Sequence, residues 1–107
     1  MDQQHPIDRL YQRIGSRQNS DTGSSYTASL LAKGTLECAK KLGEEAIETA
    51  LAAGIKDDRA LIRESADLLY HLLVLWVAAG IKPADVYAEL RAREVQSGLQ
   101  EKAARDR

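Results

Sequence analysis

The chain has 107 residues, the size of one domain, so we expect a single domain over residues 1–107. Its 15 basic and 16 acidic residues give a net charge of −1, which argues against nucleic acid or an anionic membrane as the main partner. Cys38 is the only cysteine, which excludes an intrachain disulfide and a multi-cysteine zinc site; we expect it to be a small buried residue in a reducing compartment.

The first part of the chain predicts a helix followed by a loop. Phe is absent, and Ala, Leu, Glu, Lys and Arg dominate, which favours an all-α fold. A helix over 7–14 is predicted by apolar residues at spacing i, i+3, i+4 and i+7, namely Ile7, Leu10, Tyr11 and Ile14. Residues 15–25 are polar and rich in Gly and Ser, so we expect a loop there that is a candidate mobile lid. The first dozen residues lack the apolar run of a signal peptide, and we therefore expect a cytoplasmic protein.

Two further helices are predicted before residue 55. Ser25 is a good helix cap, so a short helical turn is expected to start there and to end at Gly34. A longer helix is predicted over 35–53, and Gly54 is a typical C-terminal glycine for it.

The third main helix is the most apolar part of the chain. It is predicted to start near Asp57 or Asp58, which can cap free N–H groups, and to run to Ala79 before Gly80. Residues 68–79 are apolar except for His71, but a membrane-spanning helix needs about 20 residues. We therefore expect a core helix and no membrane segment.

The last helix is predicted to begin at Pro83, whose missing N–H would be unpaired at that position anyway, and to reach roughly Val95. Residues 98–107 are mostly charged and are expected to fray. Short connections at 54–57 and 80–83 predict that consecutive helices lie roughly antiparallel in a bundle of about four helices. Because three short companions barely cover so apolar a third helix, we also predict a homodimer.

Five acidic residues on the second and third main helices form the most informative pattern: Glu44, Glu45, Glu48, Glu64 and Asp67. Residues three or four apart on a helix have Cβ atoms about 5–6 Å apart, so Glu45 and Glu48 share one face, as do Glu64 and Asp67. If the two helices are antiparallel neighbours, the pairs can face each other.

A solvated acidic face is the simpler interpretation of this pattern, but two arguments favour a site. Asp67 occupies a helix interior, where Asp is a poor residue, beside the most apolar stretch of the chain. Two unit charges roughly 5 Å apart also repel by about 3 kcal/mol at an effective dielectric constant of 20, and a divalent cation removes that penalty. Carboxylate ligands without His or Cys select Mg²⁺, which is usually completed by water and substrate phosphates. The predicted chemistry is hydrolysis or transfer at phosphorus.

Basic residues precede the acidic pairs, and two interpretations of them stay open. Lys33, Lys40 and Lys41 could bind substrate phosphates together with a supporting Glu44, or they could form ordinary helix salt bridges. His71 lies on the Glu64 and Asp67 stripe, and we expect it to be a core residue or a second-layer neighbour of the site, not a ligand.

These residues also carry a family resemblance. The pattern from Glu44 to Glu48, followed by Glu64-Ser65-Ala66-Asp67, resembles the ExxE…ExxD signature of the all-α nucleoside-triphosphate pyrophosphatases, the MazG-like superfamily. The resemblance implies a MazG-like fold. It also implies that the Mg²⁺ ligands and catalytic residues are Glu45, Glu48, Glu64 and Asp67.

Three stretches narrow the resemblance to the phosphoribosyl-ATP pyrophosphatase family of histidine biosynthesis: residues 25–34, 40–45 and 64–72. This resemblance implies Mg²⁺-dependent hydrolysis of phosphoribosyl-ATP to phosphoribosyl-AMP and pyrophosphate by a homodimer. A chain of this length is expected to lack the cyclohydrolase domain that is fused to the family in many organisms.

Two alternatives remain at this point. One is a MazG-like housecleaning pyrophosphatase that acts on ordinary or damaged nucleotides with the same metal site. The other is a non-catalytic helical interaction module whose acidic stripe only solvates the bundle.

Overall fold

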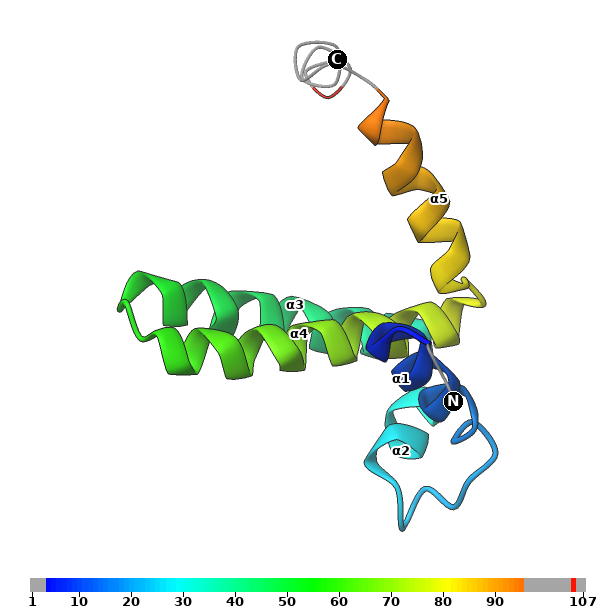
Figure 1. The fold of residues 1–107 in the computed structure, drawn as a ribbon. Coiled ribbons are helices and arrows are strands. Elements are labelled where there is room, and N and C mark those ends of the chain that lie inside the picture. Colours follow the sequence, from blue (N-terminus) through cyan, green and yellow to red (C-terminus); the bar gives the residue numbers. More distant parts are fainter. Residues whose placement is uncertain (1–3, 96–104, 106–107) are drawn as a thin grey trace.

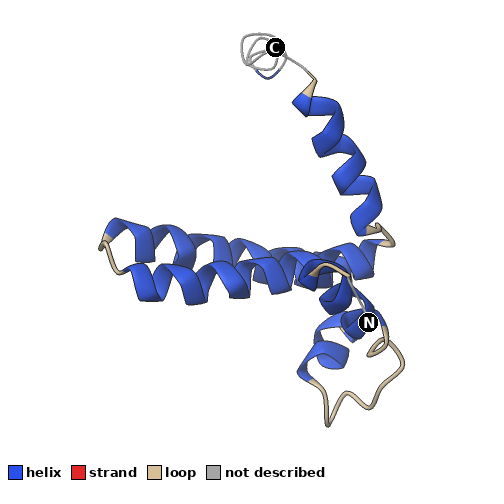
Figure 2. Cartoon of the chain, viewed as in Figure 1, coloured by secondary structure: helices blue, strands red, loops and turns tan. Residues whose placement is uncertain are grey.

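The computed structural model describes residues 4–95 and Arg105, and within these residues the secondary structure is entirely helical (Figure 2). The chain order is α1 (Pro6–Gly15), α2 (Tyr26–Ala32), α3 (Thr35–Gly54), α4 (Asp58–Ala79) and α5 (Pro83–Glu94). The predicted all-α bundle is confirmed. The expected fraying of residues 98–107 falls, apart from Arg105, outside the described residues.

Helices α3 and α4 form a long antiparallel pair, as the short connection between them predicts (Figure 1). Helix α3 ends one residue later than predicted, because Gly54 is still helical. The residue in the left-handed conformation is Lys56, with φ of 58°. The backbone N–H of Lys56 donates to the carbonyl of Ala53 over 3.0 Å, which closes the last turn of α3. The pair fixes which residues of α3 and α4 face each other.

Both ends of α4 follow local signals in the sequence. The side chain of Asp57 accepts a hydrogen bond from the N–H of Ala60 over 3.0 Å and caps the first turn. At the other end, Gly80 adopts φ of 74°, and the N–H of Ile81 donates to the carbonyl of Trp76 over 2.9 Å. This is a Schellman motif, in which a glycine takes the left-handed position without strain.

Helices α1 and α2 pack against the α4 C-terminal half and create the hydrophobic core (Figure 1). His5 caps α1 by accepting from the N–H of Ile7, and Ser25 caps α2 by accepting from the N–H of Ala28, as predicted for Ser25. The buried core residues are Ile14, Leu30, Cys38, Leu73, Val74 and Val77. Cys38 is therefore the small buried residue that the sequence predicts.

The expectation that α4 and α5 lie roughly antiparallel is wrong. The helix direction bends by 111° between α4 and α5, and α5 extends away from the bundle (Figure 1). α4 already packs against α1, α2 and α3, while α5 offers little apolar surface; in it only Pro83 is buried, and Leu90 is 53% exposed. Contacts near its base hold α5, including the hydroxyl of Tyr87, which donates to Asp8 Oδ1 over 3.1 Å.

Among the described residues, no single helix has the length and apolar character needed to cross a membrane. α4 and α5 meet those criteria only when they are taken together as a bent pair.

Candidate active site

Three of the four predicted ligands meet in the middle of the α3–α4 pair. Glu45 and Glu48 come from one face of α3, and Glu64 comes from the facing side of α4. Each can offer a carboxylate oxygen such that all three atoms lie within 4.8 Å of one another. The spacing of three residues and the antiparallel helices together produce this convergence.

The carboxylates of this cluster are under-satisfied. Glu45 is only 6% exposed, and Oε2 of both Glu45 and Glu64 is buried without a hydrogen-bond partner in the described structure. Leaving a carboxylate buried without full compensation costs several kcal/mol. The donor set consists of hard oxygen atoms with free lone pairs, so the cluster fits a metal ion that prefers oxygen ligands.

Asp67, the fourth predicted ligand, does not join this group in the structure. Its residue is exposed, one turn beyond Glu64 on α4. Its backbone carbonyl accepts a hydrogen bond from Nδ1 of His71 over 2.8 Å. The structure therefore brings three carboxylates together and leaves Asp67 at the edge.

Thr49 is a site residue that the sequence analysis missed. Its hydroxyl lies 2.8 Å from the carbonyl of Glu45 and 3.1 Å from the carbonyl of Glu64, and it can donate to either. This contact ties α3 to α4 at the level of the carboxylates. The only sequence signal for it is a hydroxyl one turn after Glu45 on the inner face of α3.

The predicted phosphate-binding residues share one cavity beside the cluster. This cavity has a volume of about 240 Å³ and is lined by Tyr26, Leu30, Lys33, Glu37, Lys40, Lys41 and Glu44. The four residues proposed from sequence are all in this lining. Three ammonium groups at one cavity, next to three carboxylates, provide places for both a polyphosphate and its counter-cation.

The three lysines differ in whether they form ion pairs. Lys41 Nζ lies 3.6 Å from Glu44 Oε2 and 3.6 Å from Glu45 Oε1. The pKa of Lys41 is raised, first by its interaction with Tyr26, against an opposing effect of desolvation, and then by Glu44 and Glu45. Lys33 and Lys40 make no ion pair within the described residues, so their charges are available to an anion.

His71 is buried behind the site, as expected for a core or second-layer residue. It is 6% exposed. Since the carbonyl of Asp67 can only accept, Nδ1 of His71 donates to it, and Nε2 is hydrogen-bonded to the Tyr26 hydroxyl over 3.2 Å. Burial raises the pKa of Tyr26, with Lys41 opposing, so the phenol stays protonated at neutral pH. His71 thus links the backbone of α4 to the Tyr26 side chain at the cavity.

Comparisons with known proteins identify the family of the chain. The profile of the family described as phosphoribosyl-ATP pyrophosphohydrolase matches residues 7–94. The chain belongs to the phosphoribosyl-ATP pyrophosphohydrolase family. This assignment confirms the resemblance carried by residues 25–34, 40–45 and 64–72.

Relatives of this family resemble the chain over most of its length. The phosphoribosyl-ATP pyrophosphatase of Parvibaculum lavamentivorans is 61% identical over 99 residues, which cover 92% of this chain and 91% of the relative. The protein of the same name from Azorhizobium caulinodans is 56% identical, with 88% and 86% covered. That from Azospirillum brasilense is 50% identical, with 92% and 89% covered.

Proposed function

We propose that this protein hydrolyses phosphoribosyl-ATP to phosphoribosyl-AMP and pyrophosphate, the second step of histidine biosynthesis. The observation that carries the proposal is the pair of buried, unpartnered oxygens on Glu45 and Glu64 beside a lysine-lined cavity, in a member of this family. In this reaction the bond between the α- and β-phosphates breaks, water supplies oxygen to one phosphorus, and pyrophosphate leaves.

We propose Mg²⁺ as the ion, held by Glu45, Glu48 and Glu64, with Asp67 as a fourth acidic ligand. The support is the hard-oxygen donor set with unfilled lone pairs, while the role of Asp67 rests on the family pattern. When bound, Mg²⁺ would neutralise phosphate charge and lower the pKa of a bound water.

The basic cavity holds the polyphosphate in this proposal. Lys33 and Lys40 have no competing ion pair among the described residues, and the raised pKa of Lys41 keeps it cationic. Glu44 lies 3.6 Å from Lys41 and positions its ammonium group near the cavity. These residues orient the anhydride bond toward the carboxylate cluster and screen its charge.

We further propose that the active form is a homodimer. Ile47, Leu51 and Ile55 form a stripe at spacing i, i+4 and i+8 on α3, and each is more than 60% exposed. Ile62 and Leu69 on α4 are exposed as well. Such an apolar surface next to Glu48 fits a second copy of the chain, which would also exclude water from the site. Sedimentation at micromolar concentration should give a dimer, and Leu51→Glu should give a monomer; a monomeric wild type would contradict this.

The near-neutral charge of the chain supports a small-molecule substrate over nucleic acid or membrane as partner. We place the enzyme in the cytoplasm, on the basis of the pathway step that we propose.

A product assay tests the proposed function. The full chain is incubated with phosphoribosyl-ATP and Mg²⁺, and phosphoribosyl-AMP and pyrophosphate are measured; dUTP and dCTP are run in parallel. We expect equimolar products from phosphoribosyl-ATP and much slower turnover of the other two. Faster turnover of dUTP or dCTP would indicate a housecleaning pyrophosphatase, and no turnover of any substrate would indicate a non-catalytic module.

A further inference from the structure

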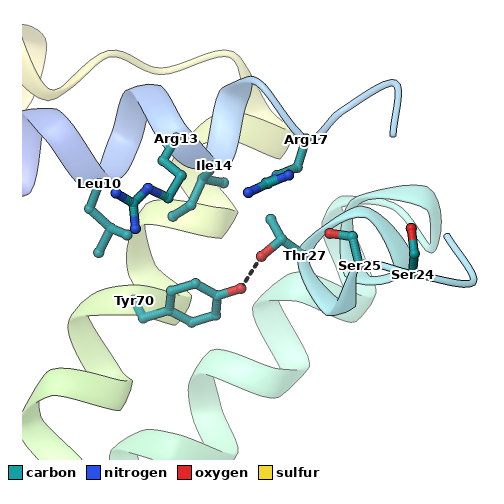
Figure 3. Close-up of a pocket in the computed structure, with 8 residues that line it drawn as sticks. All are labelled: Leu10, Arg13, Ile14, Arg17, Ser24, Ser25, Thr27 and Tyr70. Carbon is teal, nitrogen blue, oxygen red and sulfur yellow. Dashed lines mark hydrogen bonds between the residues drawn. The ribbon is translucent and has the colours of Figure 1, made fainter. Parts of the chain in front are cut away.

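A second cavity lies on the other side of α2, and its basic side chains are arginines instead of lysines. It has a volume of about 260 Å³ and is lined mainly by Arg13, Arg17, Ser24, Ser25, Thr27 and Tyr70, over an apolar wall of Leu10 and Ile14 (Figure 3). We infer that this cavity binds the 5-phosphate of the substrate's phosphoribosyl group, and so distinguishes phosphoribosyl-ATP from ATP. The inference rests on the proposed function for the identity of the substrate.

The two arginines supply positive charge that nothing in the described structure neutralises. No carboxylate lines the cavity, and neither Arg13 nor Arg17 takes part in an ion pair of the described residues. Lys41 in the first cavity, by contrast, is already paired with two glutamates. A guanidinium group presents N–H donors in a planar fork that matches phosphate oxygens, which makes two unpaired arginines a fitting phosphate site.

The backbone around the arginines is held by local hydrogen bonds. The N–H of Arg17 donates to the carbonyl of Ile14 over 3.0 Å, and the hydroxyl of Ser16 donates to the carbonyl of Arg13 over 2.6 Å. Both arginine side chains therefore extend from a hydrogen-bonded turn at the end of α1, on the side that faces the start of α2 (Figure 3). These two hydrogen bonds define the backbone from which the two arginine side chains extend.

Hydroxyl groups complete the polar lining. Ser25 Oγ accepts from the N–H of Ala28, which leaves its own hydrogen free to donate, and Thr27 is hydrogen-bonded to the Tyr70 hydroxyl (Figure 3). Beside these groups, Leu10 offers apolar surface on which a ribose ring can rest. The cavity thus suits a sugar phosphate better than a bare anion.

The position relative to the carboxylates fits one substrate molecule. Tyr70 is six residues after Glu64 on α4, which corresponds to about 9 Å along the helix axis. Tyr26 lines the first cavity and Tyr70 the second, and their rings stack with centroids 6.5 Å apart. Phosphoribosyl-ATP carries its triphosphate and its extra phosphate on opposite sides of the adenine. With the triphosphate at the lysines, the extra phosphate is the group left to reach Arg13 and Arg17.

The test compares two ligands that differ only in the phosphoribosyl group. Calorimetry measures the Kd of phosphoribosyl-AMP and of AMP for the wild type, for R13Q/R17Q, and for the control R59Q, which changes an exposed arginine at the start of α4. We expect the wild type and R59Q to bind phosphoribosyl-AMP at least about tenfold more tightly than AMP. In R13Q/R17Q this preference should vanish while the Kd of AMP changes less than about twofold.

Two results would overturn the inference: an undiminished preference in R13Q/R17Q, or an equal loss of affinity for both ligands. If the double variant melts early, the single variants R13Q and R17Q give the same comparison. Turnover of phosphoribosyl-ATP by the wild type is measured separately. Absent turnover with an intact preference would refute the hydrolase proposal alone, whereas normal turnover with an unchanged preference in the variant would refute the phosphate site alone.

Discussion

The C-terminal half of α4 and the middle of the α3–α4 pair bury side chains of opposite character. Around the C-terminal half of α4 the buried side chains are apolar: Leu73, Val74 and Cys38 are each about 1% exposed. The thiol of Cys38 has a partner, since its Sγ donates to the carbonyl of Leu30 over 3.4 Å. In the middle, Glu45 and Glu64 bury carboxylate oxygens that have no partner within the described structure. The same two helices therefore contain a region that stabilises the fold and a region that destabilises it.

The difference indicates what each region is for. Burying apolar side chains contributes about 25 cal/mol per Å² to folding, whereas burying an unpaired charge opposes it. The free energy of the apolar end allows the central carboxylates to remain close together. A site that is under-satisfied in the folded protein is then completed by a cation and a phosphate.

Replacing a central carboxylate should have the largest effect, and on activity only. Glu45→Gln keeps the shape of the side chain but removes one negative charge, so we expect turnover to fall at least about a hundredfold, the scale for loss of one charge-stabilising group. Without metal, the free energy of unfolding should be equal or slightly higher, because relief of the repulsion from Glu48 and Glu64 offsets the loss of the Lys41 contact. Glu94→Gln, an exposed change on α5, is the control for kinetics and urea denaturation. Near-normal turnover in Glu45→Gln would refute the site.

A change at the apolar end of the α3–α4 pair should lower stability and leave turnover unchanged. Leu73→Ala should lower the free energy of unfolding by about 2–5 kcal/mol, as deletion of a buried leucine leaves a cavity. The folded fraction should keep its turnover per molecule, since Leu73 does not line the carboxylate cluster or either cavity. Urea denaturation and kinetics at low temperature measure the two quantities. A stable but inactive variant would mean that the two regions are not separable.

Asp67→Asn should have an intermediate effect. If Asp67 completes the metal site from its exposed position, turnover should fall by about tenfold to a hundredfold, the scale for groups that complete or orient a metal centre. Asp58→Asn, at the start of the same helix, is the matched control. Unchanged turnover in Asp67→Asn would restrict the ligand set to Glu45, Glu48 and Glu64.

The sequence predicts the features that depend on local chemistry. Ser25, Asp57 and Gly80 mark helix ends because each supplies a side-chain acceptor or a left-handed backbone that few residues provide. The short turn between α3 and α4 makes them antiparallel, and that alone brings Glu45 and Glu64 together.

Features that depend on tertiary packing could not be predicted from the sequence. The direction of α5 is decided by the faces of α4 that α1, α2 and α3 already cover. Asp67 shares a helical spacing with Glu64, yet a step of three residues rotates it enough to reach the exposed edge. The cavity with Arg13 and Arg17 forms where the end of α1 meets α2, so no residue spacing along the chain predicts it.

Thermal melting with and without Mg²⁺ tests most directly the claim that the central carboxylates hold a cation. At a Mg²⁺ concentration of about one hundred times Kd, binding adds about 2.7 kcal/mol to stability, or about 10 °C in Tm for a domain of this size. We predict that the wild type gains this increase, while Glu45→Gln starts at an equal or higher Tm and gains little. An equal Mg²⁺-induced rise in both proteins, or none in the wild type, would contradict the account.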